Sequence, residues 1–353
     1  MNWVQTDKTA FYDVTCMGKY NAYGQEVVEC VPFIKPDGIF GMCIHASIWI
    51  CLKVLENRHI IAKCMGFSIP EIQNLATGCL YNDAQGLKFV QASRLLRMCR
   101  TAAVYINNKE ANFTDNKMIK QIYAYVAAKL PVIIGVDTSK LKWWKTGAPS
   151  YHTLVVIGYT MTNGTIDGFI VHDESALPYQ VMTIDELKNA WYEPKEQKDG
   201  HENIQKELQR DACTRELLVA VPREVSLPFH EVNNVSKILF SEMYERKIID
   251  HKIDTSKISP MLVRSRSLYV ETNIKCLHSA LVEADFPKYV WGIWFKDKNN
   301  QTTGLYVRDA TMQTDFMFSY VVEKEMAIYR LDGKTYRRCD NTNEREEIEG
   351  TIK

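Results

Sequence analysis

The sequence predicts an α+β fold, because helical patterns fill the first part of the chain and short apolar strands follow them. After Gly41, apolar residues recur at helical spacing from Cys43 to about Glu56. After Pro131, the chain changes to short apolar, β-branched runs of the kind found in buried strands. A doubly wound fold would alternate helices and strands, so we expect instead N-terminal helices packed on an antiparallel sheet.

Three more helical patterns follow the first one, over residues 70–75, 91–99 and 115–130. Pro70 suits the opening position of a helix, where its missing amide hydrogen would have no partner in any case. Asp115 is a favoured N-cap residue, and Pro131 would stop the helix that begins there. These patterns complete the helical part of the first domain.

Strands are expected over residues 132–136, 152–159, 168–171 and 217–221. The turn residues Thr162-Asn163-Gly164 separate the second and third runs, which indicates a β-hairpin. A short helix over 184–191 follows, with Thr183 as its cap and Glu186 completing a capping box. The hairpin would place the end of its second strand beside the beginning of its first.

The length of 353 residues suits two domains. We expect a first domain over residues 1–227 and a smaller α+β domain of unknown role over 228–338. A helical pattern over residues 235–247 and two apolar runs, 290–295 and 304–307, indicate the second domain. The remaining residues, 339–353, form a charged tail that we expect to be frayed.

The composition excludes several classes of protein. Lys plus Arg and Asp plus Glu both total 43, so the chain lacks the basic surplus of a nucleic-acid binder, and we expect no nucleic-acid partner. No apolar run approaches the roughly 18 residues needed to span a bilayer. Charged residues at positions 7, 8 and 13 would interrupt a signal peptide. We therefore expect a cytoplasmic protein without a membrane partner, and its oligomeric state stays open.

Metal and cofactor sites are not expected from the sequence. The ten cysteines are scattered without the CxxC spacing of structural zinc, and in a protein that is not exported most should be reduced thiols. The triplet His172-Asp173-Glu174 superficially resembles a set of zinc ligands, but no HxxxH or cysteine pair accompanies it. The sequence also contains no P-loop and no convincing GxGxxG pattern.

Cys43 stands at the start of the first helix, in the segment GMCIHASIW. A helix N-terminus presents unpaired amides and a partial positive charge, which lower the pKa of a thiol and favour the nucleophilic thiolate. The same amides can form part of an oxyanion site. When its position is considered alone, an inert buried cysteine is the alternative.

His152 and Asp173 extend this hypothesis. His152 opens a strand after the polar segment 146–150, so its side chain can reach a pocket while the strand behind it is buried. Asp173 follows the next strand, and the hairpin would bring its carboxylate to His152 and fix the ring tautomer. Alone, His152 could be a surface histidine and Asp173 a turn residue. With Cys43 they suggest a nucleophile, a base and an orienting acid.

This order of a cysteine on a helix, a histidine on a strand and an aspartate after the next strand resembles the papain-like cysteine peptidase superfamily. Within it, the chain is similar to the bacteriocin leader-processing (double-glycine) peptidases and their free-standing relatives, over residues 39–191. The matching parts are Cys43 with the small Ala46 three positions later, the strand HTLVVIGY from His152 to Tyr159, Asp173, Pro178, and the small helix ending at Trp191. The resemblance implies a papain-like first domain and a bacterial or phage origin.

Two positions depart from the family pattern. The family usually has a glutamine several residues before the cysteine, whose amide completes the oxyanion hole, but Asp37 stands six residues upstream here. An ionised Asp37 cannot donate that hydrogen bond, and the more distant Gln25 would replace it only if the loop folds back. Cys43 itself is the third oxyanion candidate. Ile44 stands where glycine is common.

Three further residues are candidates for the substrate cleft. Trp143 and Trp144 precede His152 and would either wall a cleft or anchor a loop. His45 lies two residues from Cys43 and faces another side of the helix, so it is either structural or part of the pocket lining.

The leading function is therefore a cysteine hydrolase that cleaves a peptide or isopeptide bond in a peptide or protein substrate, through an acyl-enzyme on Cys43. Acyl transfer, as in transglutaminases and arylamine acetyltransferases, uses the same order of residues and is an alternative. Because one lost oxyanion donor costs about 3 kcal/mol, a catalytically inactive papain-fold binding module is another.

Overall fold

Contacts between Cα atoms in a computed structural model divide the chain into two units, Met1–Pro222 and Arg223–Lys353. The domain boundary expected between residues 227 and 228 lies a short way inside the second unit. The structure describes residues 10–15, 18–22, 26–35, 42–61, 68–77, 87–107, 115–144, 151–163, 165–191, 216–229, 231–234, 236, 241, 245, 260–265, 268, 286–296, 302–312, 317–321, 326–331, 334–339 and 345–348.

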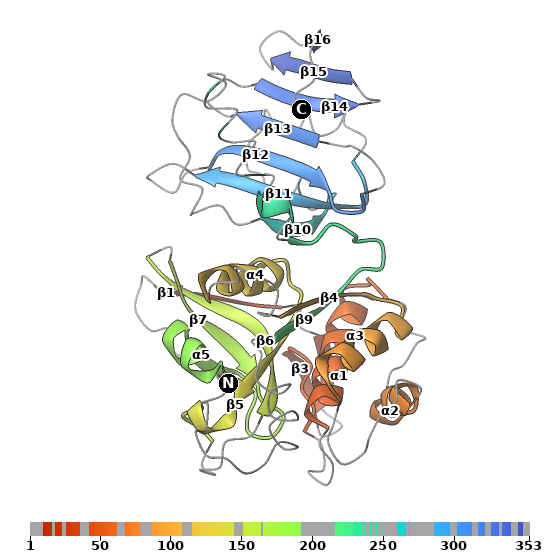
Figure 1. Cartoon of the computed structure of the whole chain (residues 1–353), viewed down its shortest axis with the longest axis vertical. Coiled ribbons are helices and arrows are strands. Elements are labelled where there is room, and N and C mark those ends of the chain that lie inside the picture. Colours follow the sequence, from red (N-terminus) through yellow and green to blue (C-terminus); the bar gives the residue numbers. More distant parts are fainter. Residues whose placement is uncertain are drawn as a thin grey trace, which may run out of the picture. The chain divides into compact units, whose positions relative to one another are not determined.

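A seven-stranded antiparallel sheet forms the centre of the first unit (Figure 1). Six strands lie in the order β4-β9-β5-β6-β7-β8, and β1 also pairs with β6. β5 pairs with the first half of β6, and β1 pairs with its second half. The bounds are β1 (Ala10–Val14), β4 (Ala102–Asn107), β5 (Val132–Asp137), β6 (Tyr151–Thr162), β7 (Thr165–His172), β8 (Gln180–Thr183) and β9 (Glu216–Val221). β2 (Gly18–Ala22) and β3 (Glu26–Cys30) form a separate two-stranded ribbon.

The helices of this unit lie on both sides of the sheet. Figure 1 shows the sheet between the helices α1 to α3 and the helices α4 and α5. The bounds are α1 (Cys43–Asn57), α2 (Ile69–Thr77), α3 (Phe89–Met98), α4 (Asp115–Ala127) and α5 (Ile184–Ala190), and residues Thr138–Lys140 form the 3₁₀ turn η2. In the described part of the chain, none of the helices combines the length and apolar character needed to cross a membrane. The predicted α+β architecture is confirmed.

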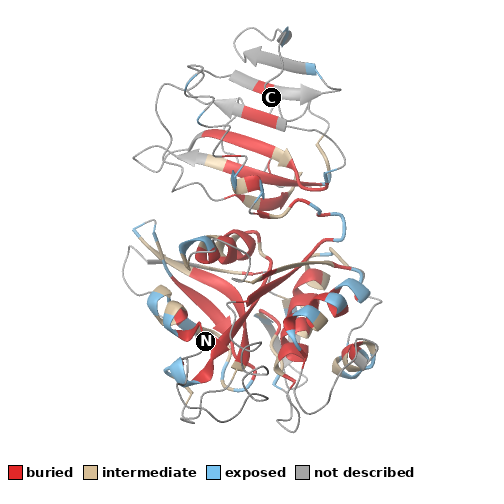
Figure 2. Cartoon of the chain, in the orientation of Figure 1, coloured by how far each residue is buried: buried red, intermediate tan, exposed pale blue. Residues whose placement is uncertain are grey.

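The core of the first unit is the middle of its sheet. Every residue of β5 and β9 is buried, and so are residues 152–159 of β6 (Figure 2). Both faces of these strands are covered, which explains why they are continuous apolar runs without polar alternation. The same burial removes the beginning of β6, where His152 lies, from solvent.

Several predicted elements are confirmed. The first helix begins at Cys43, and β6 and β7 form the predicted hairpin. The capping box of α5 forms as expected: the hydroxyl of Thr183 accepts from the amide of Glu186 at 3.1 Å, and the Thr183 amide donates to the Glu186 carboxylate at 2.8 Å. β4 and β8 were not predicted, because each is short and only partly buried, so neither has a clear apolar pattern.

The second unit contains a seven-stranded antiparallel sheet whose strands follow one another in chain order. The bounds are β10 (Met261–Arg264), β11 (Tyr289–Lys296), β12 (Thr302–Asp309), β13 (Met317–Val321), β14 (Met326–Leu331), β15 (Lys334–Cys339) and β16 (Arg345–Ile348). β11 and β12 contain the two predicted apolar runs. The predicted helix of this unit falls mostly outside the described residues.

Residues 345–348, within the charged tail that we expected to be frayed, form the strand β16, which pairs with β15. Opposite charges meet between these strands where Lys334 contacts Glu347 at 3.1 Å. Complementary cross-strand charges stabilise such a pair. A charged sequence can therefore continue the sheet here.

Candidate active site

Cys43 is the first residue of α1 and is only partly exposed. The N-cap residue, Met42, makes no side-chain capping bond, and the first turn contains no acidic residue. The amides at a helix N-terminus have no partner within the helix, so this end can stabilise an anion. The local sequence thus places the Cys43 thiol beside amides that can stabilise a negatively charged oxygen.

A hydrogen bond holds α1 against the beginning of β6. Ser47 lies one turn after Cys43, and its hydroxyl is 3.2 Å from the hydroxyl of Thr153, the neighbour of His152. Both residues are buried. This contact positions the start of the helix beside the start of the strand, and the Cys43 sulfur lies within 4.8 Å of a ring nitrogen of His152.

Asp173 reaches the same place from the end of β7. His172 is the partner of Val155 in the hairpin, so the next residue, Asp173, lies near the beginning of β6. Its Oδ1 atom is 3.0 Å from Nε2 of His152. The same oxygen accepts from the amide of Ser175 at 3.0 Å, which fixes the carboxylate within a tight turn. The hairpin therefore joins His152 and Asp173, as the sequence predicts.

The charges around His152 favour its protonated form. Burial alone lowers the pKa of this imidazole, but the hydrogen bonds to Asp173 and Cys43 and the charges of Glu174 and Cys43 outweigh it. The pKa of His152 is raised to about 10. Burial raises the pKa of Asp173, but the hydrogen bond and charge of His152, with further bonds from Trp143 and Ser175, lower it below its ordinary value. An imidazolium–carboxylate pair results.

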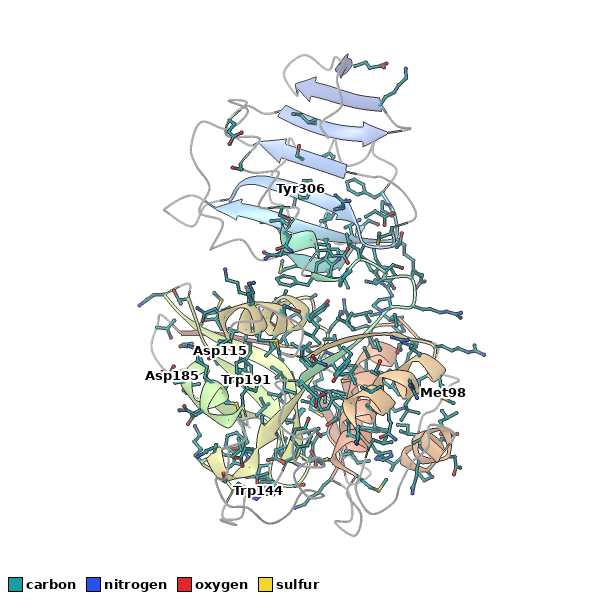
Figure 3. The ribbon with its side chains drawn as sticks, in the orientation of Figure 1. Met98, Asp115, Trp144, Asp185, Trp191 and Tyr306 are labelled. Carbon is teal, nitrogen blue, oxygen red and sulfur yellow. The ribbon has the colours of Figure 1, made fainter. Side chains whose placement is uncertain are left out.

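The two tryptophans contact this pair directly. They follow η2. Asp137 caps the N-terminus of this turn, because its Oδ1 atom accepts a hydrogen bond from the Ser139 amide at 2.9 Å. The indole nitrogen of Trp143 donates to Asp173 Oδ2 at 2.8 Å. The ring of Trp144, labelled in Figure 3, lies 5.1 Å from the His152 ring between centroids. Both were proposed as cleft walls, and both are partly exposed.

Glu174 also contacts His152, and the sequence did not predict this contact. Its Oε1 atom lies 3.5 Å from His152 Nε2, and the side chain is 2% exposed. Burial is the largest influence on the Glu174 carboxyl and raises its pKa, against the opposing charge of His152. Its position directly after Asp173 was the available signal. Sequence alone does not say which of two adjacent acids turns toward the histidine.

The remaining site candidates from the sequence are His45, Gln25 and Asp37. His45 is completely buried, and burial lowers the pKa of its imidazole to about 4. This burial favours the structural role, of the two roles that the sequence left open. Gln25 and Asp37, the oxyanion candidates, lie outside the described residues.

One group of side chains in the described part of the chain could hold a metal ion. Cys43, His152 and Glu174 each offer one ligand atom, and these atoms all lie within 4.8 Å of one another. The group coincides with the candidate nucleophile and base, and it joins residues that are distant in the sequence. No spacing rule applied to the sequence would have found it.

Comparison with models of protein families assigns the chain to a family. No curated protein matches it. The model of the peptidase C39-like family matches residues 23–199 of the 353. This span includes α1, β6 and the turn after β7, and thus Cys43, His152, Asp173 and Glu174. The chain therefore belongs to the peptidase C39-like family, a papain-like relative of the bacteriocin-processing cysteine peptidases.

Proposed function

We propose that this protein is a cysteine peptidase that cleaves a peptide or isopeptide bond through an acyl-enzyme on Cys43. The observation that carries this proposal is the environment of His152, which is hydrogen-bonded to a buried carboxylate on one side and lies beside the Cys43 thiol. A histidine so placed can take the proton of the thiol and keep it as an imidazolium.

The reaction has two halves. The Cys43 sulfur attacks the carbonyl carbon of the scissile bond, and His152 returns its proton to the leaving nitrogen as the C–N bond breaks. Water then attacks the thioester, with His152 as the base, and the acid product and free thiol result. The uncapped N-terminus of α1 supplies amides toward the negative oxygen of each tetrahedral intermediate.

Asp173 acts through His152. Its bond to Nε2 keeps the hydrogen of the neutral ring on that nitrogen, so that the lone pair of Nδ1 is available to the thiol. Trp143 and Ser175 hold the carboxylate in turn. We therefore assign Asp173 as the residue that orients and stabilises the base.

The first test is the rate of Cys43 alkylation by iodoacetamide against pH, with the modified site identified by mass spectrometry. We expect the wild type to react at lower pH than His152→Ala, because the imidazolium stabilises the thiolate. His59→Asn, a change at an exposed histidine, is the matched control and should follow the wild type. Identical profiles for wild type and His152→Ala would contradict the ion pair.

A second measurement separates the possible reactions. A pool of quenched fluorescent peptides should be cleaved by the wild type and not by Cys43→Ala. Transfer of the acyl group to an added amine, without hydrolysis in its absence, would identify an acyltransferase instead. Binding of peptides without either reaction would identify a binding module and overturn the proposed peptidase.

A further inference from the structure

We propose that Cys43, His152 and Glu174 form a reversible binding site for a thiophilic divalent metal ion, with Zn²⁺ as the best fit. A thiolate, an imidazole and a carboxylate are the three ligand types that proteins use for zinc. Here one atom of each lies within 4.8 Å of the other two. The three residues come from the start of α1, the start of β6 and the turn after β7, so the fold itself gathers them.

The distances are close to those of a formed site. Zinc–ligand bonds of about 2.0–2.3 Å in a tetrahedron correspond to ligand separations of roughly 3.3–3.6 Å. Compared with the 4.8 Å limit, the ligand atoms would have to approach one another by up to about 1.5 Å. Rotations about side-chain bonds are sufficient for a movement of that size. Three protein ligands leave a fourth position for water, as in open zinc sites.

Asp173 already provides the outer support that zinc-binding histidines commonly have. A metal-bound histidine usually donates the hydrogen of its other ring nitrogen to a carboxylate, which fixes the ring. Asp173 Oδ1 accepts from His152 Nε2 at 3.0 Å, which leaves Nδ1 to bind a metal. Glu174 Oε1 now lies 3.5 Å from Nε2, so its carboxylate would turn toward Nδ1 on metal binding. Trp143 and Ser175 hold the Asp173 carboxylate in its turn.

The balance of charge also favours a cation. Two carboxylates and a thiol surround one imidazole, and Asp173 and Glu174 are 0% and 2% exposed. These groups lie together in a buried place, and a divalent ion bound among them compensates negative charge that burial makes costly. The partial exposure of Cys43 leaves the metal a route from solvent.

A bound metal would stop the proposed reaction, because it occupies both the sulfur lone pair and the ring nitrogen that peptide cleavage needs. This consequence rests on the proposed function, whereas metal binding itself does not. The metal-bound protein would thus be an inhibited resting form, from which a chelator releases the free thiol.

The test uses the full chain, reduced and freed of metal, titrated with Co²⁺ while the thiolate-to-cobalt charge-transfer absorption is recorded. We expect one strong site, displaced by Zn²⁺. Cys43→Ala should abolish the absorption, and Glu174→Gln should weaken binding by roughly 10–100-fold. Cys30→Ser, at another partly exposed thiol, should leave the titration unchanged. Circular dichroism shows whether each variant is folded.

Two outcomes would overturn the metal site: an unchanged absorption in folded Cys43→Ala, or wild-type affinity in folded Glu174→Gln. The proposed function fails separately. If Co²⁺ and Zn²⁺ bind as expected but peptides are not cleaved after chelation, the site stands and the peptidase does not. If peptides are cleaved and Zn²⁺ neither binds nor inhibits, the peptidase stands and the metal site does not.

Discussion

Two buried histidines in the same hairpin have opposite environments. His152, at the start of β6, contacts the carboxylates of Asp173 and Glu174 and lies near the Cys43 thiol. His172, at the end of β7, packs between aromatic rings, with Phe33 at 5.2 Å and Tyr179 at 4.7 Å between centroids. Burial lowers the pKa of the His172 imidazole to about 3, whereas the pKa of His152 is raised to about 10.

The comparison shows that burial alone produces a neutral structural histidine, and that adjacent anions turn an equally buried one into a stable cation. The consequences for stability have opposite signs. The contribution of His152 is fully present below the ordinary pKa of 6.5 and is lost as the pH rises through about 10. The contribution of His172 is present above 6.5 and is lost as the pH falls toward 3.

The largest expected effect comes from making the surroundings of His152 more like those of His172. Asp173→Asn removes the carboxylate that orients and charges the ring, so kcat/KM for a cleaved peptide should fall by on the order of 10³-fold. The pKa of His152, followed by NMR titration, should fall as well. Asp185→Asn makes the same chemical change at an exposed position of α5 and should have no such effect. A loss below tenfold would contradict the role of Asp173.

The second effect concerns stability in acid. Between pH 7 and pH 4, protonation of unfolded His172 should cost the protein on the order of 3 kcal/mol of unfolding free energy. His172→Gln should reduce this pH dependence, measured by urea unfolding at several pH values. Phe33→Leu disturbs the same packing without removing a titratable group, so it should lower stability equally at every pH. An unchanged slope in His172→Gln would show that His172 is not the acid-sensitive group.

The smallest effect separates the two tryptophans beside His152. Trp143→Phe removes the indole donor to Asp173 and should lower kcat about tenfold, because one hydrogen bond to a charged group is lost. KM should change little. Trp144→Phe keeps an aromatic ring against His152 and should have a smaller effect. Equal effects of the two substitutions on kcat would argue against a specific contribution of the Trp143–Asp173 bond.

Much of the first unit could be predicted from local sequence. α1 begins at Cys43, because apolar residues recur at helical spacing from there. The hairpin of β6 and β7 follows from two apolar runs around Thr162-Asn163-Gly164. Strands with mixed or charged patterns, such as β4 and β16, were missed, because cross-strand partners distant in the sequence stabilise them.

The sequence by itself determined the order of the helices and of the buried strands β5, β6, β7 and β9, and the positions of Cys43, His152 and Asp173 at the ends of their elements, because periodicity and turn residues act over short distances. Only the tertiary structure decided what surrounds each side chain. It turned Glu174 toward His152, bonded Trp143 to Asp173, and buried His45. The physical reason is that the pKa of a side chain and its contacts depend on burial and on charges from other elements, and packing alone brings those together.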